Sequence, residues 1–130
     1  MEAAFENICR PYEREGLKAA LLTDREGITL LKFTTNEISS KILSPLLATT
    51  FSMTSDQSSK LGLGQNNTII STFSLHQILQ FNHSPLIITL VANSQANTGL
   101  LLELGAALRE LTEPIIENLT QRRASNPTAV

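Results

Sequence analysis

The two histidines are the residues of this sequence with the clearest capacity for chemistry. His76 and His83 flank a run of strand-like residues, and imidazole serves as a general base or as a ligand for zinc. A zinc site usually needs three or four protein ligands, whereas no cysteine or carboxylate stands near either histidine along the chain. We therefore interpret both as solvent-facing side chains at strand ends, and the sequence predicts no metal site.

Two other short patterns offer little more chemistry. Gly62-Leu63-Gly64 lacks the Gly-Lys-Ser/Thr of a phosphate-binding loop and is interpreted as a helix stop. Asp24 and Glu26 could bind a cation, but carboxylates in a turn are more often simply hydrated. Because no activated nucleophile or carboxylate pair is evident, the sequence predicts a non-catalytic chain without a cofactor.

The end of the chain carries two patterns of another kind. Arg122-Arg123-Ala124-Ser125 resembles a basophilic kinase site with Ser125 as the acceptor, and Thr128-Ala129-Val130 has the form of a PDZ ligand. Both patterns are short enough to arise by chance. They therefore carry little weight in assigning a function.

Length and charge restrict the remaining classes of function. A chain of 130 residues, 42% of them hydrophobic, suits a single compact domain. A net charge of -2 gives no general attraction to nucleic acid or to acidic membranes. The N-terminus lacks the features of a secretory signal, the apolar runs are too short to cross a bilayer, and the lone Cys9 fits a reducing compartment. We expect a cytosolic protein that binds no nucleic acid and does not insert into a membrane.

Hydrophobic periodicity and turn residues predict three helices and five strands. Helices are expected at residues 2–13, from Ser44 to about Lys60, and at 98–121, and strands at 17–23, 28–33, 68–74, 75–82 and 86–92. This order predicts an α+β fold with a mixed or antiparallel five-stranded sheet, forming one domain over residues 1–121. Pro114 is expected to kink the last helix, and the polar, aperiodic residues 122–130 are expected to form a disordered tail.

One long stretch of the chain is almost free of charge. From Ile42 to Leu102 the only formal charges are Asp56 and Lys60. A helix surface or sheet edge that faces water normally carries several lysines and glutamates. This gap suggests that something other than water covers part of the stretch.

The second helix and the strand after it are the candidates for a covered surface. On a helical wheel the small residues of the helix form a stripe opposite a broad apolar arc, which would let a second helix approach closely. The strand at 68–74 has no lysine or proline to protect it at a sheet edge. Alternatively, the strand is internal and the serines simply face solvent. The expected partner-binding residues are Ala48, Phe51, Ser52, Ser55, Ser59, Ile69, Ile70, Ser71, Thr72 and Phe73.

Three segments of the chain carry a family resemblance. TTFSMTSDQSSKLGLGQNNTIIS, QILQFNHSPLIITLVA and NSQANTGLLLEL occur in this order and at family-like spacing. Together with the hairpin near Asp24 they resemble the roadblock-type Ragulator subunits known as MAP-kinase scaffold or MEK partner proteins. The resemblance covers roughly residues 16–104, whereas Pro11, Gly105, Pro114 and the tail depart from the pattern.

The resemblance implies a roadblock fold, with a five-stranded antiparallel sheet between one helix and a pair of helices. It implies an obligate heterodimer with a second roadblock subunit, joined through the second helices and third strands. It further implies a non-catalytic scaffold on late endosomes or lysosomes, held there by a lipidated Ragulator subunit. Such a scaffold would tether Rag GTPases for TOR signalling and bring a MAP-kinase kinase to its MAP kinase. Two alternatives of the same fold are a GTPase regulator and a dynein-associated light chain.

Overall fold

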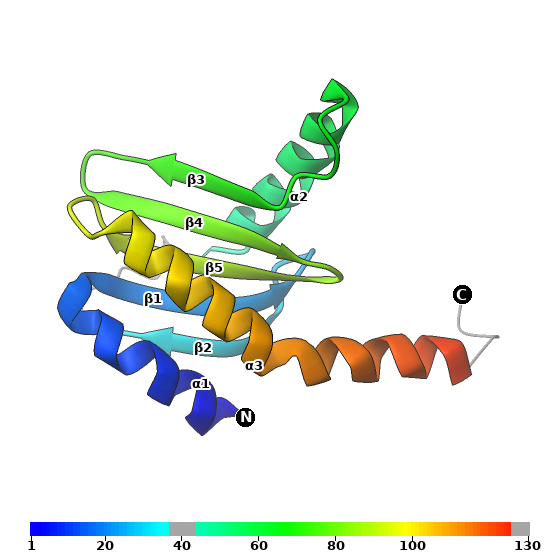
Figure 1. The fold of residues 1–130 in the computed structure, drawn as a ribbon, viewed down its shortest axis with the longest axis horizontal. Helices are drawn as coiled ribbons and strands as arrows, with labels where there is room; N and C mark the ends of the chain where they lie inside the picture. The colour runs from blue at the N-terminus through cyan, green and yellow to red at the C-terminus, as the bar shows by residue number, and fades with distance from the viewer. Residues whose placement is uncertain (37–43, 126–130) are drawn as a thin grey trace.

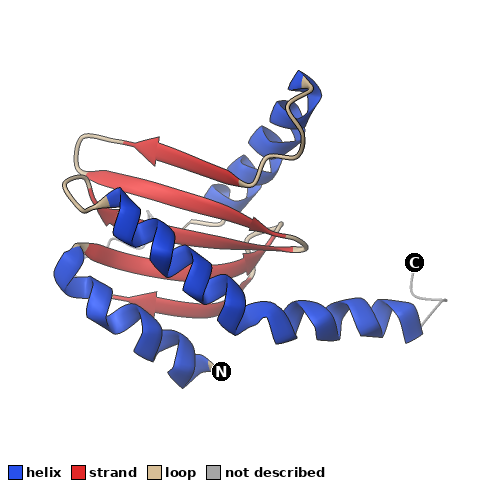
Figure 2. Ribbon diagram, viewed as in Figure 1, coloured by secondary structure: helices blue, strands red, loops and turns tan. Residues whose placement is uncertain are grey.

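A single antiparallel sheet with helices on both faces forms this domain (Figures 1 and 2). The structure is a computed structural model that describes residues 1–36 and 44–125. Its elements are the helices α1 (Glu2–Cys9), α2 (Leu46–Ser58) and α3 (Thr98–Ser125), the 3-10 helices η1 (Arg10–Glu15) and η2 (Ser59–Leu61), and the strands β1 (Leu17–Asp24), β2 (Thr29–Thr34), β3 (Thr68–Thr72), β4 (His76–His83) and β5 (Leu86–Asn93). The predicted α+β fold is confirmed.

The five strands run in the order β2-β1-β5-β4-β3, and every neighbouring pair is antiparallel. β1 and β2 form the expected hairpin. In its turn, Oδ1 of Asp24 accepts hydrogen bonds from the amides of Glu26 and Ile28, at 3.0 and 2.9 Å. Gly27 adopts a φ of 92°, which favours glycine. The Asp24 carboxylate thus has a structural role in closing the hairpin.

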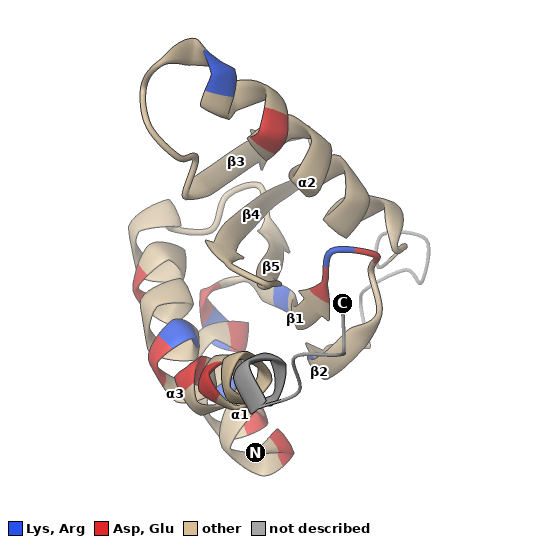
Figure 3. Ribbon diagram, turned by 90° about the vertical axis from the view of Figure 1, so that its right-hand side faces the viewer, with Lys and Arg blue, Asp and Glu red and all other residues tan. Residues whose placement is uncertain are grey.

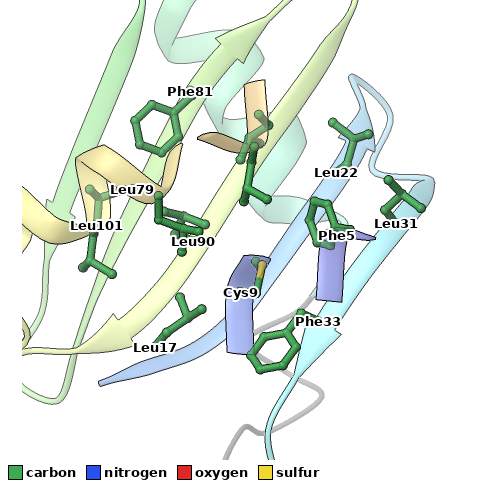
Figure 4. Packing of buried hydrophobic residues seen from close by; sticks show 14 of the residues in the cluster. Phe5, Cys9, Leu17, Leu22, Leu31, Phe33, Leu79, Phe81, Leu90 and Leu101 are labelled. Carbon is green, nitrogen blue, oxygen red and sulfur yellow. The ribbon is translucent and has the colours of Figure 1, made fainter. Parts of the chain in front are cut away.

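The two faces of the sheet are covered by different helices. α1 and α3 lie on one face, where Phe5 and Cys9 pack with Leu101 and with the strand side chains Leu79 and Leu90 (Figure 4). α2 lies on the other face. This is the predicted arrangement of one helix against a pair. Burial of apolar side chains at about 25 cal/mol per Å² is the main force that holds these layers together.

Both ends of the chain differ from expectation. The first helix changes to a 3-10 helix at Arg10, because Pro11 has no amide hydrogen to continue the α-helical ladder. α3 contains Pro114, bends in its middle and projects past the sheet (Figure 1). It continues to Ser125, so residues 122–125 are helical where a disordered tail was expected. The PDZ-like pattern at 128–130 lies outside the described residues.

The interpretation of His83 as a solvent-facing side chain is wrong. His83 is buried, and its Nε2 lies 2.9 Å from the hydroxyl of Thr112 on α3. Alternation along β4 explains this, since His83 shares a face with Leu79 and Phe81, which form the core beneath α3. His76, at the other end of β4, is half-buried.

Candidate partner-binding surface

β3 is an edge strand, as the interface hypothesis requires. It pairs with β4 on one side only, and no described strand pairs with its other side. The amide of Phe73 donates to the carbonyl of His76 at 2.8 Å, which places the backbone groups of odd-numbered β3 residues, including Ser71, on the side of β4. The residues whose amides and carbonyls point to the free edge are therefore Thr68, Ile70 and Thr72.

The side chains of β3 alternate between the two faces of the sheet. Ile69 packs beneath α2 against Ala48, Phe51 and Ile87. Ile70 lies on the opposite face of the sheet, where its side chain is 46% exposed. The strand thus contributes one anchor to the fold and leaves apolar surface together with unpaired backbone at its free edge.

α2 is turned so that its small residues, together with Phe51, pack against the sheet. Ala48 and Phe51 are each 3% exposed and lie against the sheet, so they are not accessible to a partner in this structure. Leu46 and Met53, which lie on the broad apolar arc of the helical wheel, are 71% and 70% exposed. Ala48 lets α2 approach its own sheet closely, and the large apolar side chains of Leu46 and Met53 point outward.

The serines of the predicted stripe make contacts within the chain. Ser52 donates to the carbonyl of Ala48 at 3.1 Å, and Ser55 accepts a 3.1 Å hydrogen bond from the side-chain amide of Asn66. Nε of Arg25 lies 3.4 Å from the Ser52 hydroxyl. Ser59, which is exposed, donates to the carbonyl of Asp56 at 2.8 Å. These serines help to fix α2 against the hairpin turn and the segment before β3.

An ion pair crosses the space between the hairpin turn and α2. Arg25 and Asp56 approach to 3.2 Å, and both side chains are at least half exposed. A pocket of about 120 Å³ opens beside them, with Phe51 and Ile87 at its base. An exposed pair of this kind contributes little to stability, typically about 0–1 kcal/mol.

The end of α2 presents further apolar surface that sequence reasoning did not single out. Gly62 and Gly64 adopt φ values of 74° and 90°, which end the helix as expected. Leu61 and Leu63 beside them are 70% and 85% exposed. The end of α2 projects past β3 (Figure 1).

The charge-poor character of this region is confirmed in three dimensions. Acidic and basic residues gather on α1, α3 and the hairpin turn, while α2 with η2 carries only Asp56 and Lys60 (Figure 3). The free edge of β3 adds no charge to this region. We call the exposed residues Leu46, Thr50, Met53, Thr54 and Leu61 of α2 and η2 the uncharged surface; it is suited to contact another protein.

Other kinds of site find no support in the described residues. Within residues 1–36 and 44–125, His, Cys, Asp and Glu form no group of three or more that could hold a metal ion. Over the same residues, no helix combines the length and apolar character needed to cross a membrane.

Comparison with known proteins agrees with this geometry. A family model described as "Mitogen-activated protein kinase kinase 1 interacting" matches residues 2–121. Ragulator complex protein LAMTOR3 of Danio rerio is 44% identical over 107 residues, which cover 82% of this chain and 83% of that protein. Ragulator complex protein LAMTOR3-A of Xenopus laevis is 41% identical over 106 residues, covering 78% of this chain and 86% of that protein.

A solved structure is similar in fold at much lower identity. The Roadblock/LC7 domain from Streptomyces avermitilis superposes with a TM-score of 0.65 at 14% identity, covering 78% of this chain and 87% of that domain. At that identity the similarity concerns the fold alone. The chain and that domain share the sheet and its covering helices.

Proposed function

Because the chain belongs to the mitogen-activated protein kinase kinase 1 interacting family and has the roadblock fold, we propose that it is a non-catalytic scaffold subunit of a Ragulator-like complex. The relatives at about 40% identity carry that complex in their names. The observation that carries the proposal is the uncharged surface on α2 beside the unpaired edge of β3. A subunit that functions alone would leave this apolar surface in water.

The proposed partner is a second roadblock subunit, bound as a heterodimer. Its third strand pairs with the free amides and carbonyls of Thr68, Ile70 and Thr72, and the two sheets become continuous. Its second helix lies against the outward face of α2, where Leu46 and Met53 supply apolar contact. Of the ten residues first expected to bind this partner, Ile70 and Thr72 are best placed, whereas Ala48 and Phe51 support the interface from beneath.

The wider role follows from the same family. In the proposed complex the heterodimer helps to tether Rag GTPases for TOR signalling and brings a MAP-kinase kinase near its MAP kinase. A lipidated subunit holds the complex on the cytoplasmic face of late endosomes or lysosomes. The charged outer surfaces of α1 and α3 stay free for such contacts when β3 and α2 are covered.

Co-expression with the other roadblock proteins of the same genome tests the proposal. One of them should form a stable heterodimer on size exclusion, and affinity purification should recover further Ragulator subunits with it. Ile70→Pro removes an amide that points to the partner and should abolish the heterodimer, while Ile70→Thr keeps the amide and should retain it.

Two results would overturn the proposal. One is a chain that pairs with no roadblock protein, and the other is an Ile70→Pro variant that pairs normally. The alternatives are distinguished in the same material. A GTPase regulator would change nucleotide exchange or hydrolysis as an isolated chain, and a dynein light chain would be recovered with dynein intermediate chain.

A further inference from the structure

The sheet has a second free edge along β2. In the strand order β2 lies at the end opposite β3, and no described strand pairs with its outer side. The amide of Thr35 donates to the carbonyl of Lys18 at 3.0 Å, which places the backbone groups of odd-numbered β2 residues on the side of β1. The residues whose amides and carbonyls point to the free edge are Lys32 and Thr34; the register shifts between Leu22 and Thr23, so this alternation does not continue through Leu30.

A groove of about 410 Å³ lies along this edge, between α1 and β2. Glu2 and Glu6 of α1 line one side of it, and residues 29–32 line the other. Glu6 forms a 2.9 Å ion pair with Arg10, whereas Glu2 has no ion-pair partner in the described part of the chain. The wall formed by α1 therefore has unneutralised negative charge.

The other side of the edge has a different character. Leu31 and Phe33 are buried on the face toward α1, so Leu30 and Lys32 point to the opposite face. Leu30 is 39% exposed, and Lys32 is exposed and has no hydrogen-bond or ion-pair partner among the described residues. A strand added here would meet carboxylates on one face and, on the other, a leucine and an amine.

We propose that this edge binds an extended segment of a partner protein, which joins the sheet as an additional strand beside β2. The segment that fits has basic residues on the face toward Glu2 and Glu6. On its other face it has apolar residues flanking an acidic residue opposite Lys32. This site is independent of the proposed heterodimer, which uses β3 at the far edge of the sheet.

Charge distinguishes this occupant from a second copy of the chain. Two copies paired edge to edge through β2 would bring two Lys32 amines together. The Glu2 and Glu6 carboxylates of both copies would also lie along the same pair of strands. Like charges placed opposite each other across strands are destabilising, and an edge lysine opposes self-pairing. A segment with basic residues toward Glu2 and Glu6 and an acidic residue opposite Lys32 avoids both like-charge contacts.

The probe is the capped peptide Thr-Val-Arg-Glu-Arg-Val-Thr, titrated into the isotopically labelled full-length chain and followed by NMR. Saturable shifts are expected in the amides of Lys32 and Thr34. Replacing both arginines of the peptide with glutamate, or methylating the amides that face β2, should weaken binding about tenfold or more, since charge contacts or ladder hydrogen bonds are lost.

Matched variants locate the site on the protein. Lys32→Pro and Lys32→Gln both remove the charge, but only the proline removes the outward amide, so it should bind the peptide about fivefold to tenfold more weakly. Ile70→Pro blocks the β3 edge and should bind the peptide normally. This last result separates the inference from the proposed heterodimer, which the same variant disrupts.

The methylated peptide keeps the test decisive even if Lys32→Pro fails to fold, because it alters only the ligand. Equal binding by the methylated and unmodified peptides would overturn the proposal. So would shifts that map to Thr68–Thr72, no binding at all, or a Lys32-dependent dimer of the chain itself.

Discussion

The hydroxyl of Thr112 lies 2.9 Å from Nε2 of His83, and this contact joins α3 to the end of β4 inside the core. The same hydroxyl donates to the carbonyl of Leu108 at 2.7 Å. Because a hydroxyl has one proton to give, Nε2 of His83 must carry the hydrogen that Thr112 accepts. The contact thus places a hydrogen on Nε2 of a buried histidine.

Stability should therefore fall in mild acid. Burial lowers the pKa of His83 below its usual 6.5; the nearby charge of Glu113 opposes this and that of Arg109 adds to it. The unfolded chain then binds a proton at a pH where the folded chain does not, so the folded state loses stability as pH falls below about 6.5. Urea unfolding between pH 8 and pH 5.5 measures this, and His83 should contribute almost no change above pH 7.5.

His83→Gln is the control for this effect. Its amide can still donate to Thr112, but it does not titrate, so the loss of stability between pH 7 and pH 5.5 should shrink relative to the parent chain. An identical pH dependence in both proteins would assign the effect to other groups.

The Cys9 thiol should be unreactive in the folded protein. Its side chain is fully buried between α1 and the sheet, and burial, with a smaller effect of Glu6, raises its pKa to about 12. At pH 8 almost no thiolate is present, and a reagent has no access to the sulfur. A coloured disulfide reagent should label Cys9 only at the rate of unfolding, and immediately in denaturant. Rapid labelling of the native chain would contradict the packing of α1.

Gly105 is required where α3 crosses Phe81. A Cβ atom at this position would meet Cε1 of Phe81 at 2.9 Å and lie still closer to two other ring atoms. Phe81 is buried and cannot move freely, so Gly105→Ala should destabilise the fold by about 1–3 kcal/mol, partly offset by about 1 kcal/mol of helix propensity. Chemical denaturation measures this change.

Phe81→Leu should make room for the new methyl group. The double variant should therefore be less destabilised than the sum of the two single changes, as expected for residues in contact. Strict additivity would show that the two positions do not clash.

The order of elements could be read from the sequence because it depends on local periodicity. The continuous apolar run at 86–92, the glycine in the first hairpin turn and the spacing of leucines in α3 each indicate their own element. The burial of His83 could also be predicted from the sequence, since His83 continues the alternation of Leu79 and Phe81. It was missed because a histidine at a strand end was assumed to face water.

The rotation of α2 could not be obtained in the same way. Periodicity identifies an apolar side of a helix, but it does not say whether that side meets the chain's own sheet or another protein. Here Ala48 and the serines lie toward the sheet, because small side chains allow the helix to approach it closely. The side-chain amide of the buried Gln80 donates a 2.8 Å hydrogen bond to the carbonyl of Leu47 and holds the helix in this position. Leu46 and Met53 are then left exposed.

This orientation changes which substitutions should separate folding from assembly. Thr50 and Met53 are exposed on the uncharged surface, so Thr50→Glu with Met53→Glu should leave thermal unfolding of the isolated chain within about 0.5 kcal/mol of the parent. In the heterodimer the same pair would bury two like charges, costing several kcal/mol, about 3–5 by analogy with broken buried pairs. Size exclusion with the roadblock partner should show separate subunits, whereas Met53→Leu should still assemble.

Ser52→Glu with Ser55→Glu is the matched pair on the opposite face of α2. These half-buried serines contact Arg25 and Asn66 within the chain, so two glutamates should lower the stability of the isolated chain by about 1–3 kcal/mol. Assembly should weaken only as far as folding does. If this pair instead abolishes the heterodimer with unchanged unfolding, while Thr50→Glu with Met53→Glu still assembles, the partner must bind the serine face and α2 must turn in the complex.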